Sequence, residues 1–186
     1  MDLHGLLSNI YNAEIGIDAG RKGFATKGRA EEGRILYETG IAEALTSFME
    51  AQSTRDPQII LLAEYTFLTQ ELELTSKTDI HTINSLTQAI QSFDDAFLAL
   101  QIVEDKTLYQ GANKTYPRHR KYRIKAYPKD AYHIAFISHR TRIQNILRTP
   151  GVDPIEKDLL EQRLSNLSTA QVGYVEKQRK ALSIKN

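Results

Sequence analysis

The stretch that decides the fold runs from residue 79 to residue 109 and reads DIHTINSLTQAIQSFDDAFLALQIVEDKTLY. Its apolar residues recur at alternating spacings of three and four: Ile83, Leu86, Ile90, Phe93, Phe97 and Leu100. This spacing places them on one face of an α-helix and is typical of the seam of a helical bundle. Because a helix of this length rises about 45 Å, we expect it to be the long central helix of the fold.

A second helix is predicted to begin immediately after Asp56, with Pro57 in its first turn. It opens the segment PQIILLAEYTFLTQELEL, in which the run from Ile59 to Ala63 is apolar on every face. A buried parallel strand is the alternative for such a run, but the length of the segment and its Gln, Glu and Leu ending favour a helix. We expect this helix to be buried in the centre of the molecule.

The C-terminal region, residues 130–182, is predicted to be a helical hairpin. Its first helix is DAYHIAFISHRTRIQNILR, and the segment TPGV supplies a short connection. Asp153, Pro154 and Glu156 have the spacing of a capping box with proline in the first turn, so the second helix should start there.

Residues 1–40 contain seven glycines and predict an irregular N-terminal segment, because glycine at this density disfavours a helix. A helix is expected only from Ile41 onward. Within this region the fragment Ile15-Gly16-Ile17-Asp18-Ala19-Gly20 resembles the strand and turn that open the actin-like and RuvC-like kinases and nucleases. Those folds continue with several strands, whereas everything downstream here has a helical pattern, which favours a helix interrupted by glycine. The sequence therefore predicts one all-α domain over residues 1–186, an antiparallel bundle of about five helices.

Composition excludes several classes of site. The chain has no cysteine, which removes disulfides, thiolate metal sites and cysteine nucleophiles. The five histidines include no pair spaced i, i+4, and no glutamate has a histidine three residues later, so neither a metal nor a cofactor is expected. No signal-peptide pattern and no apolar run of about 20 residues occurs, which predicts a cytoplasmic protein without a membrane partner.

Charge is strongly segregated along the chain. Residues 1–113 carry 8 Lys and Arg against 17 Asp and Glu, whereas residues 114–148 carry 10 Lys and Arg against the single Asp130. The stretch KTYPRHRKYRIKAYPK at residues 114–129, called the basic segment below, holds seven of these cations and no acidic residue. Residues 110–128 have neither helical nor strand periodicity and include two Tyr-Pro steps, which predict an extended loop.

Tyrosine is concentrated in the same place, with five of the nine tyrosines between residues 109 and 132. Cations interleaved with aromatic rings suit single-stranded nucleic acid, because cations follow phosphates and rings stack on bases. The predicted nucleic-acid-binding residues are Lys114, Tyr116, Arg118, Arg120, Lys121, Tyr122, Arg123, Lys125, Tyr127, Lys129, Arg140 and Arg142. The alternative is that the basic segment neutralises the acidic half of the same chain, or of a neighbouring copy in a homo-oligomer.

Catalysis has little support in the sequence. No phosphate-binding glycine loop and no GxSxG nucleophile elbow occurs. Glu64 is the one carboxylate in an unusual setting, because its neighbours three and four residues away are Ile60, Leu61, Phe67 and Leu68. Such a carboxylate is expected to form a buried ion pair with an arginine of another helix, the alternative being an acid or base in an enzyme.

The sequence thus favours a non-enzymatic binding protein whose basic segment contacts a polyanion, RNA or DNA, with weak sequence preference. The alternative from another class is a scaffolding bundle that assembles with itself or with an acidic protein partner.

Overall fold

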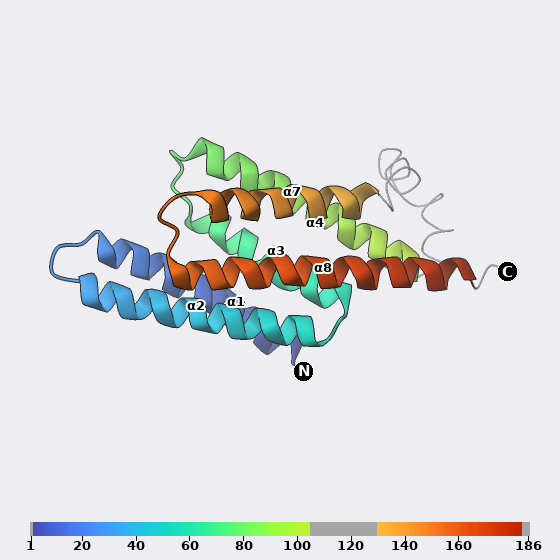
Figure 1. Ribbon diagram of the computed structural model, residues 1–186, viewed down its shortest axis with the longest axis horizontal. Coiled ribbons are helices and arrows are strands. Elements are labelled where there is room, and N and C mark those ends of the chain that lie inside the picture. The colour runs from blue at the N-terminus through green and yellow to red at the C-terminus, as the bar shows by residue number, and fades with distance from the viewer. Residues whose placement is uncertain (1, 105–129, 184–186) are drawn as a thin grey trace.

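The computed structural model describes residues 2–104 and 130–183. Within these ranges the chain is all-α, as predicted, and forms six helices. They are α1 (Leu3–Phe24), α2 (Ala30–Ser53), α3 (Pro57–Leu74), α4 (Ile80–Glu104), α7 (Asp130–Arg148) and α8 (Pro154–Ser183). Each helix runs antiparallel to the one before it (Figure 1).

Two helices, α3 and α8, form the centre of the arrangement. Helix α3 contacts α1, α2 and α4, and α8 contacts α2, α4 and α7, while α3 and α8 also contact each other. The prediction that the helix after Asp56 is central is therefore confirmed. The predicted central position of the helix at residues 79–109 is not confirmed. Among the described helices, α4 contacts mainly α3, α7 and α8, and it lies on one side of the molecule (Figure 1). A single apolar seam with polar residues on the opposite face suits an outer helix.

Local capping explains where α3 and α8 begin. The Asp56 carboxylate accepts a hydrogen bond from the backbone N–H of Gln58 at 2.9 Å, and Asp153 accepts one from Ile155 at 2.8 Å. Both predicted helix starts are confirmed, since each cap satisfies an N–H group that the helix itself leaves unpaired. Glu156 does not complete the capping box, because its carboxylate is bound by side chains of α1 and α2.

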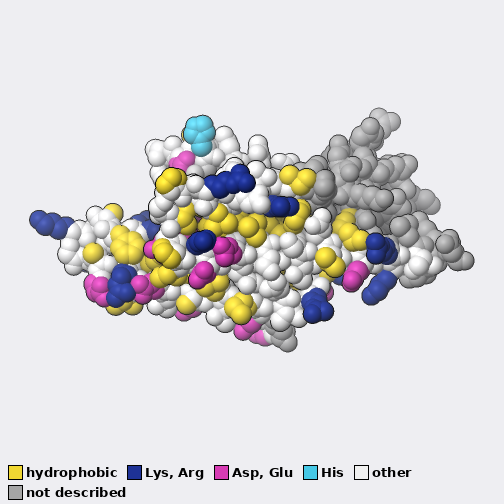
Figure 2. Space-filling view, viewed as in Figure 1, with side chains coloured by type: hydrophobic (Ala, Val, Ile, Leu, Met, Phe, Trp, Pro, Cys, Tyr) yellow, Lys and Arg dark blue, Asp and Glu magenta, His cyan; other side chains and the backbone are white. Residues whose placement is uncertain are grey.

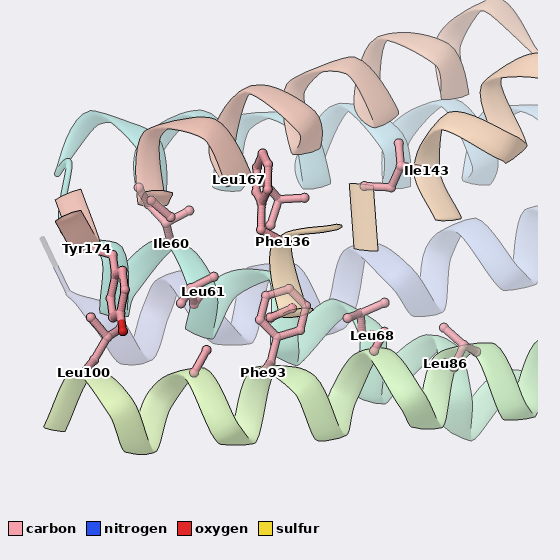
Figure 3. Packing of buried hydrophobic residues seen from close by; sticks show 14 of the residues in the cluster. Ile60, Leu61, Leu68, Leu86, Phe93, Leu100, Phe136, Ile143, Leu167 and Tyr174 are labelled. Carbon is pink, nitrogen blue, oxygen red and sulfur yellow. The ribbon is translucent and has the colours of Figure 1, made fainter. Parts of the chain in front are cut away.

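One hydrophobic core, called the α4–α7 core, lies between α3, α4, α7 and α8 (Figure 3). The seam residues Leu86, Phe93 and Leu100 of α4 are fully buried in it. They pack with side chains such as Leu61 and Leu167 from the two central helices. Large apolar side chains of this kind each contribute about 1.5–3 kcal/mol on complete burial.

A second core, called the α1–α2 core, lies between α1, α2, α3 and α8. Its large buried side chains include Ile10 and Ile17 of α1, Ile41 and Phe48 of α2, and Phe67 of α3. The two cores therefore share α3 and α8, and each outer pair of helices closes one of them.

Residues 3–24 and 30–40 are helical rather than irregular, which corrects the prediction made from the glycines of residues 1–40. Helix α1 passes without interruption through Gly16, Gly20 and Gly23. A Cβ atom on Gly20 would lie 2.6 Å from the backbone of Tyr37, and one on Gly33 would lie 2.8 Å from the backbone of Gly23. The glycines therefore allow the backbones of α1 and α2 to come into contact, and burial of this interface outweighs their low helix propensity.

The strand-like resemblance of residues 15–20 is also wrong. Ile17 points into the α1–α2 core, while Asp18 forms an exposed i, i+4 ion pair with Lys22 at 2.5 Å. Ile15 to Gly20 thus form part of one helix rather than a strand and turn.

Candidate functional site

The basic segment lies outside the described residues, which end at residue 104 and resume at residue 130. Ten of the twelve predicted nucleic-acid-binding residues belong to it: Lys114, Tyr116, Arg118, Arg120, Lys121, Tyr122, Arg123, Lys125, Tyr127 and Lys129. Their role stays a prediction from the sequence.

The other two predicted residues, Arg140 and Arg142, lie on α7 and have different surroundings. Arg140 is exposed, with its guanidinium carbon 5.8 Å from the centre of the Phe136 ring. Arg142 points inward instead, where its Nη2 donates to Glu71 Oε1 of α3, and only 11% of its side chain is accessible. Of these two cations, only Arg140 is available at the surface.

The helix ends that flank the basic segment lie at one end of the bundle. Helix α4 ends and α7 begins at the end where α8 finishes (Figure 1), and Leu100 of α4 lies beside Tyr174 of α8 (Figure 3). Beyond Tyr174, helix α8 carries the exposed cations Arg179 and Lys180. Figure 2 shows Lys and Arg side chains at this end, with an acidic side chain beside them. The chain therefore leaves α4 and begins α7 at the end of the bundle that carries these two cations.

A second candidate site is a group of ionisable side chains inside the bundle, called the ionic cluster below. It comprises Glu14 and Arg21 of α1, Glu64 and Glu71 of α3, His139 and Arg142 of α7, and Glu156 and Arg163 of α8. The cluster extends from the half-exposed Arg21 to the fully buried Glu64 and His139.

Glu64 forms the deepest part of the ionic cluster. Its Oε2 lies 3.0 Å from Nε of Arg163 and 3.0 Å from Nε2 of His139. The predicted ion pair between Glu64 and an arginine of another helix is therefore confirmed. The Arg163 guanidinium also lies over the Phe67 ring, 4.6 Å from its centre, which adds a cation–π contact to the ion pair.

Burial and pairing act in opposite directions on Glu64. Burial alone would raise the pKa of this carboxyl, but the charge of Arg163 and the hydrogen bond with His139 lower it below its usual value. Burial lowers the pKa of His139, against the opposing effect of Glu64. His139 Nδ1 is buried and has no hydrogen-bond partner, so a proton on this nitrogen would be an unsatisfied donor. His139 is therefore neutral, with Nε2–H donating to Glu64.

The outer part of the ionic cluster contains the remaining pairs. Arg21 donates to Glu156 Oε1 at 2.9 Å, and the Tyr37 hydroxyl donates to Glu156 Oε2 at 2.9 Å. Glu14 is only 2% exposed, and its nearest cation, Nη1 of Arg21, is 4.0 Å away. Glu14 is the least well compensated carboxylate of the cluster.

Sequence reasoning found Glu64 and missed the rest of the cluster. The same sequence pattern, a carboxylate among apolar residues at helical spacing, is present at Glu14. This residue lies between Ile10 and Ile17 on the apolar face of its helix. The cluster also repeats a spacing of seven residues, which keeps both members of a pair on one helix face. The three such pairs are Glu14 with Arg21, Glu64 with Glu71, and Glu156 with Arg163.

The chemistry open to the ionic cluster is proton binding and structural pairing. The described residues contain no group of three or more His, Asp or Glu side chains that could hold a metal ion. Glu64, His139 and Arg163 are almost entirely enclosed, so a substrate could not reach them in this arrangement.

Comparison with protein-family models, curated proteins and solved structures finds no match for this chain. None of the helices in the described ranges has both the length and the apolar composition required to span a bilayer.

Proposed function

We propose that the protein binds a polyanion, most readily single-stranded nucleic acid, through the basic segment and the adjoining end of the bundle. The observation that carries the proposal is the run of seven cations in residues 114–129 with no acidic residue among them. Arg118, Arg120, Lys121, Arg123 and Lys125 contact phosphates, and Tyr116, Tyr122 and Tyr127 stack on bases. Binding has weak sequence preference, because phosphate contacts carry no base information.

Two structural observations support this proposal. First, carboxylates of the acidic half are paired with cations that lie outside the basic segment: Glu64 with Arg163, Glu71 with Arg142, and Asp56 with Lys177. These carboxylates do not require the basic segment for neutralisation. Second, the exposed Arg179 and Lys180 extend the positive charge at the end of the bundle where the segment is attached.

The proposal is tested by fluorescence anisotropy with a labelled single-stranded RNA and a DNA of the same sequence. The double variant Arg118→Gln/Arg120→Gln is compared with Lys27→Gln/Arg29→Gln, which removes the same charge from the exposed loop between α1 and α2 at the opposite end. Loss of two phosphate contacts should weaken binding and reduce the slope of log affinity against log salt by about 1.4. The control variant should bind as the wild type does.

Light scattering, with and without the oligonucleotide, separates this function from scaffolding. A monomer that gains the mass of one or more oligonucleotides supports nucleic-acid binding. A stable dimer or larger assembly whose mass is unchanged by oligonucleotide contradicts it and supports the scaffolding alternative. Equal losses of affinity in the two double variants would also contradict the proposal.

A further inference from the structure

A small cavity lies within the ionic cluster, at the boundary between the two hydrophobic cores. Its volume is about 30 Å³, whereas one water molecule needs about 10–15 Å³. Apolar side chains line it from both sides, Ile17, Ile41 and Phe67 from the α1–α2 core and Ile146 and Leu160 from the α4–α7 core. The remaining lining residues are mainly the charged members of the cluster.

Three polar atoms at this cavity are buried without a hydrogen-bond partner. They are Oε2 of Glu14, Oε2 of Glu71 and Nη1 of Arg142, from helices α1, α3 and α7. Leaving such atoms unsatisfied costs about 1–3 kcal/mol each, and more where the group is charged. One water molecule has two donor and two acceptor positions. It can therefore accept from Arg142 Nη1, donate to Glu71 Oε2, and either accept from Glu14 Oε2 when that oxygen carries a proton or donate to it when it does not.

The charges of the ionic cluster do not balance without a further proton. Four carboxylates face three guanidinium groups, and His139 is neutral by the argument given above. An unbalanced charge in a buried cluster is unfavourable, so one carboxylate should be protonated. Glu64, Glu71 and Glu156 each accept a hydrogen bond from an arginine, whereas Glu14 has its nearest arginine nitrogen 4.0 Å away. Protonation of Glu14 therefore requires less free energy than protonation of the other three carboxylates.

We propose that this cavity is a binding site for one proton and one water molecule, in which Glu14 carries the proton at neutral pH and the water bridges Glu14, Glu71 and Arg142. The site joins α1 to α3 and α7, and so connects the helices of the two cores. Loss of the proton places a fourth negative charge at the boundary between the cores. Deprotonation therefore weakens the attachment of the α1–α2 pair to the rest of the bundle.

The charged and titratable groups around Glu14 agree with this assignment. They are Asp18 and Arg21 of α1, Tyr37 of α2, Glu71 of α3, Arg142 of α7, and Glu156 and Arg163 of α8. Burial raises the pKa of Glu14 and the Glu71 carboxylate raises it further, while Arg21 and Arg163 lower it, with the outcome at about 8. Asp18 acts in the same direction as Glu71.

The proton is tested by infrared difference spectroscopy of the wild type against Glu14→Gln. Gln has the shape of the protonated carboxyl, so this variant should fold. At neutral pH the difference should show the C=O band of a carboxylic acid, which disappears with a midpoint near pH 8. A carboxylate band for Glu14 at pH 6 would overturn the proposal.

Two single-site variants on α1 make this test independent of the Gln substitution. Arg21→Gln removes a charge that favours ionised Glu14, so the midpoint of the band should move to higher pH. Lys22→Gln, at the exposed neighbouring position, should leave the midpoint unchanged. An unchanged midpoint in Arg21→Gln would contradict the assignment of the band to a carboxyl beside Arg21.

The attachment of the α1–α2 pair is tested by hydrogen exchange between pH 7 and pH 8, with intrinsic exchange rates removed. Protection of amides in α1 and α2 should fall several-fold in the wild type, with a limit of about tenfold per pH unit. Protection in Glu14→Gln should stay constant over this range. Equal pH dependence in the two proteins would overturn the coupling between the proton and helix attachment.

The water is tested by a crystal structure at neutral pH, where density should lie within hydrogen-bond distance of the three unpartnered atoms. A site filled by side-chain movement instead would overturn the water assignment. The competing ligand is a sodium or potassium ion, in which case raising the concentration of either salt, but not of choline chloride, would lower the pH midpoint of the infrared band. That outcome would replace the proton with a monovalent cation and overturn the proposal, whereas equal effects of the three salts would support it.

Discussion

The two outer helix pairs of this bundle, α4 with α7 and α1 with α2, come into contact through different kinds of residue. The α4–α7 core relies on large side chains at seam positions, such as Phe93 and Leu86, whereas α1 and α2 approach each other through glycines such as Gly20 and Gly33. Large side chains tolerate small shifts of a helix, because neighbouring side chains can adjust. Where two helix backbones are in contact, no side chain lies between them that could adjust to such a shift. Both cores depend on the volume that their large side chains fill, but the contact between α1 and α2 depends in addition on the absence of side chains at its glycines.

The largest expected effect comes from emptying a core. Phe93→Ala should lower the free energy of unfolding by about 4 kcal/mol, because a fully buried ring leaves a cavity. Phe48→Ala, at an equally buried ring in the α1–α2 core, is the matched variant. Denaturant unfolding measures the loss, and hydrogen exchange locates it. Hydrogen exchange should become faster mainly in α4 and α7 in the first variant, and mainly in α1 and α2 in the second. Identical exchange patterns would show that the two cores are not distinct.

The next effect tests the boundary between the cores. Glu64→Gln should lower the free energy of unfolding by about 3 kcal/mol, because Arg163 would remain buried without its anionic partner. Nucleic-acid affinity, measured where the variant is fully folded, should be unchanged. Glu31→Gln, whose carboxylate pairs with Arg34 at the surface, is the control and should leave the free energy of unfolding almost unchanged. A loss of nucleic-acid affinity in folded Glu64→Gln would instead support a functional role for this carboxylate.

A smaller effect should follow from filling the glycine interface. Gly33→Ala should lower the free energy of unfolding by about 2 kcal/mol, because the new Cβ would lie 2.8 Å from backbone atoms of α1. Gly16→Ala is the matched control at the same interface, where the nearest atom would be 3.6 Å away. The control should be neutral or more stable by about 0.5–1 kcal/mol, since Ala favours the helix. Thermal denaturation of both variants measures the difference in stability. Equal destabilisation would show that the distance from the new Cβ to the neighbouring backbone does not determine the loss.

The smallest effect concerns pH. Because folding raises the pKa of Glu14 from 4.5 to about 8, its contribution to stability is fully present below pH 4.5 and is lost as the pH rises through 8. The free energy of unfolding should fall by about 1 kcal/mol between pH 7 and pH 8, and Glu14→Gln should remove this dependence. His139, whose pKa is lowered, has the opposite sign, and its contribution declines as the pH falls below 6.5. Urea unfolding at a series of pH values measures both slopes.

The parts of the fold that could be predicted depend on local sequence. The starts of α3 and α8 follow from Asp56 and Asp153, whose caps involve only residues two positions further along the chain. The α4 seam follows from periodicity alone. Which helix is central could not be obtained in the same way, because the length of α4 does not determine how many neighbours it has. The helices within residues 1–40 were not predicted, because Gly20 and Gly33 favour them only by allowing close approach of the partner helix, which the local sequence does not show.

For the candidate sites too, features that depend on local sequence could be predicted, whereas features that depend on tertiary packing could not. A buried ion pair for Glu64 follows from its apolar neighbours, but the identity of Arg163 as partner depends on the packing of α8 against α3. Arg142 was predicted to contact phosphate from its place near the basic segment. The structure turns it toward Glu71, because the face of α7 on which a residue lies is set by tertiary contacts.

The adjacent, antiparallel placement of α4 and α7 has a consequence for how this protein can diverge and be engineered. Their contact fixes the positions at which the chain leaves Glu104 and returns at Asp130, whatever sequence lies between them. Doubling the length of a flexible connection between fixed points costs only about 0.6 kcal/mol in closure entropy. An insertion of flexible residues between these two helix ends should therefore change the stability of the bundle little.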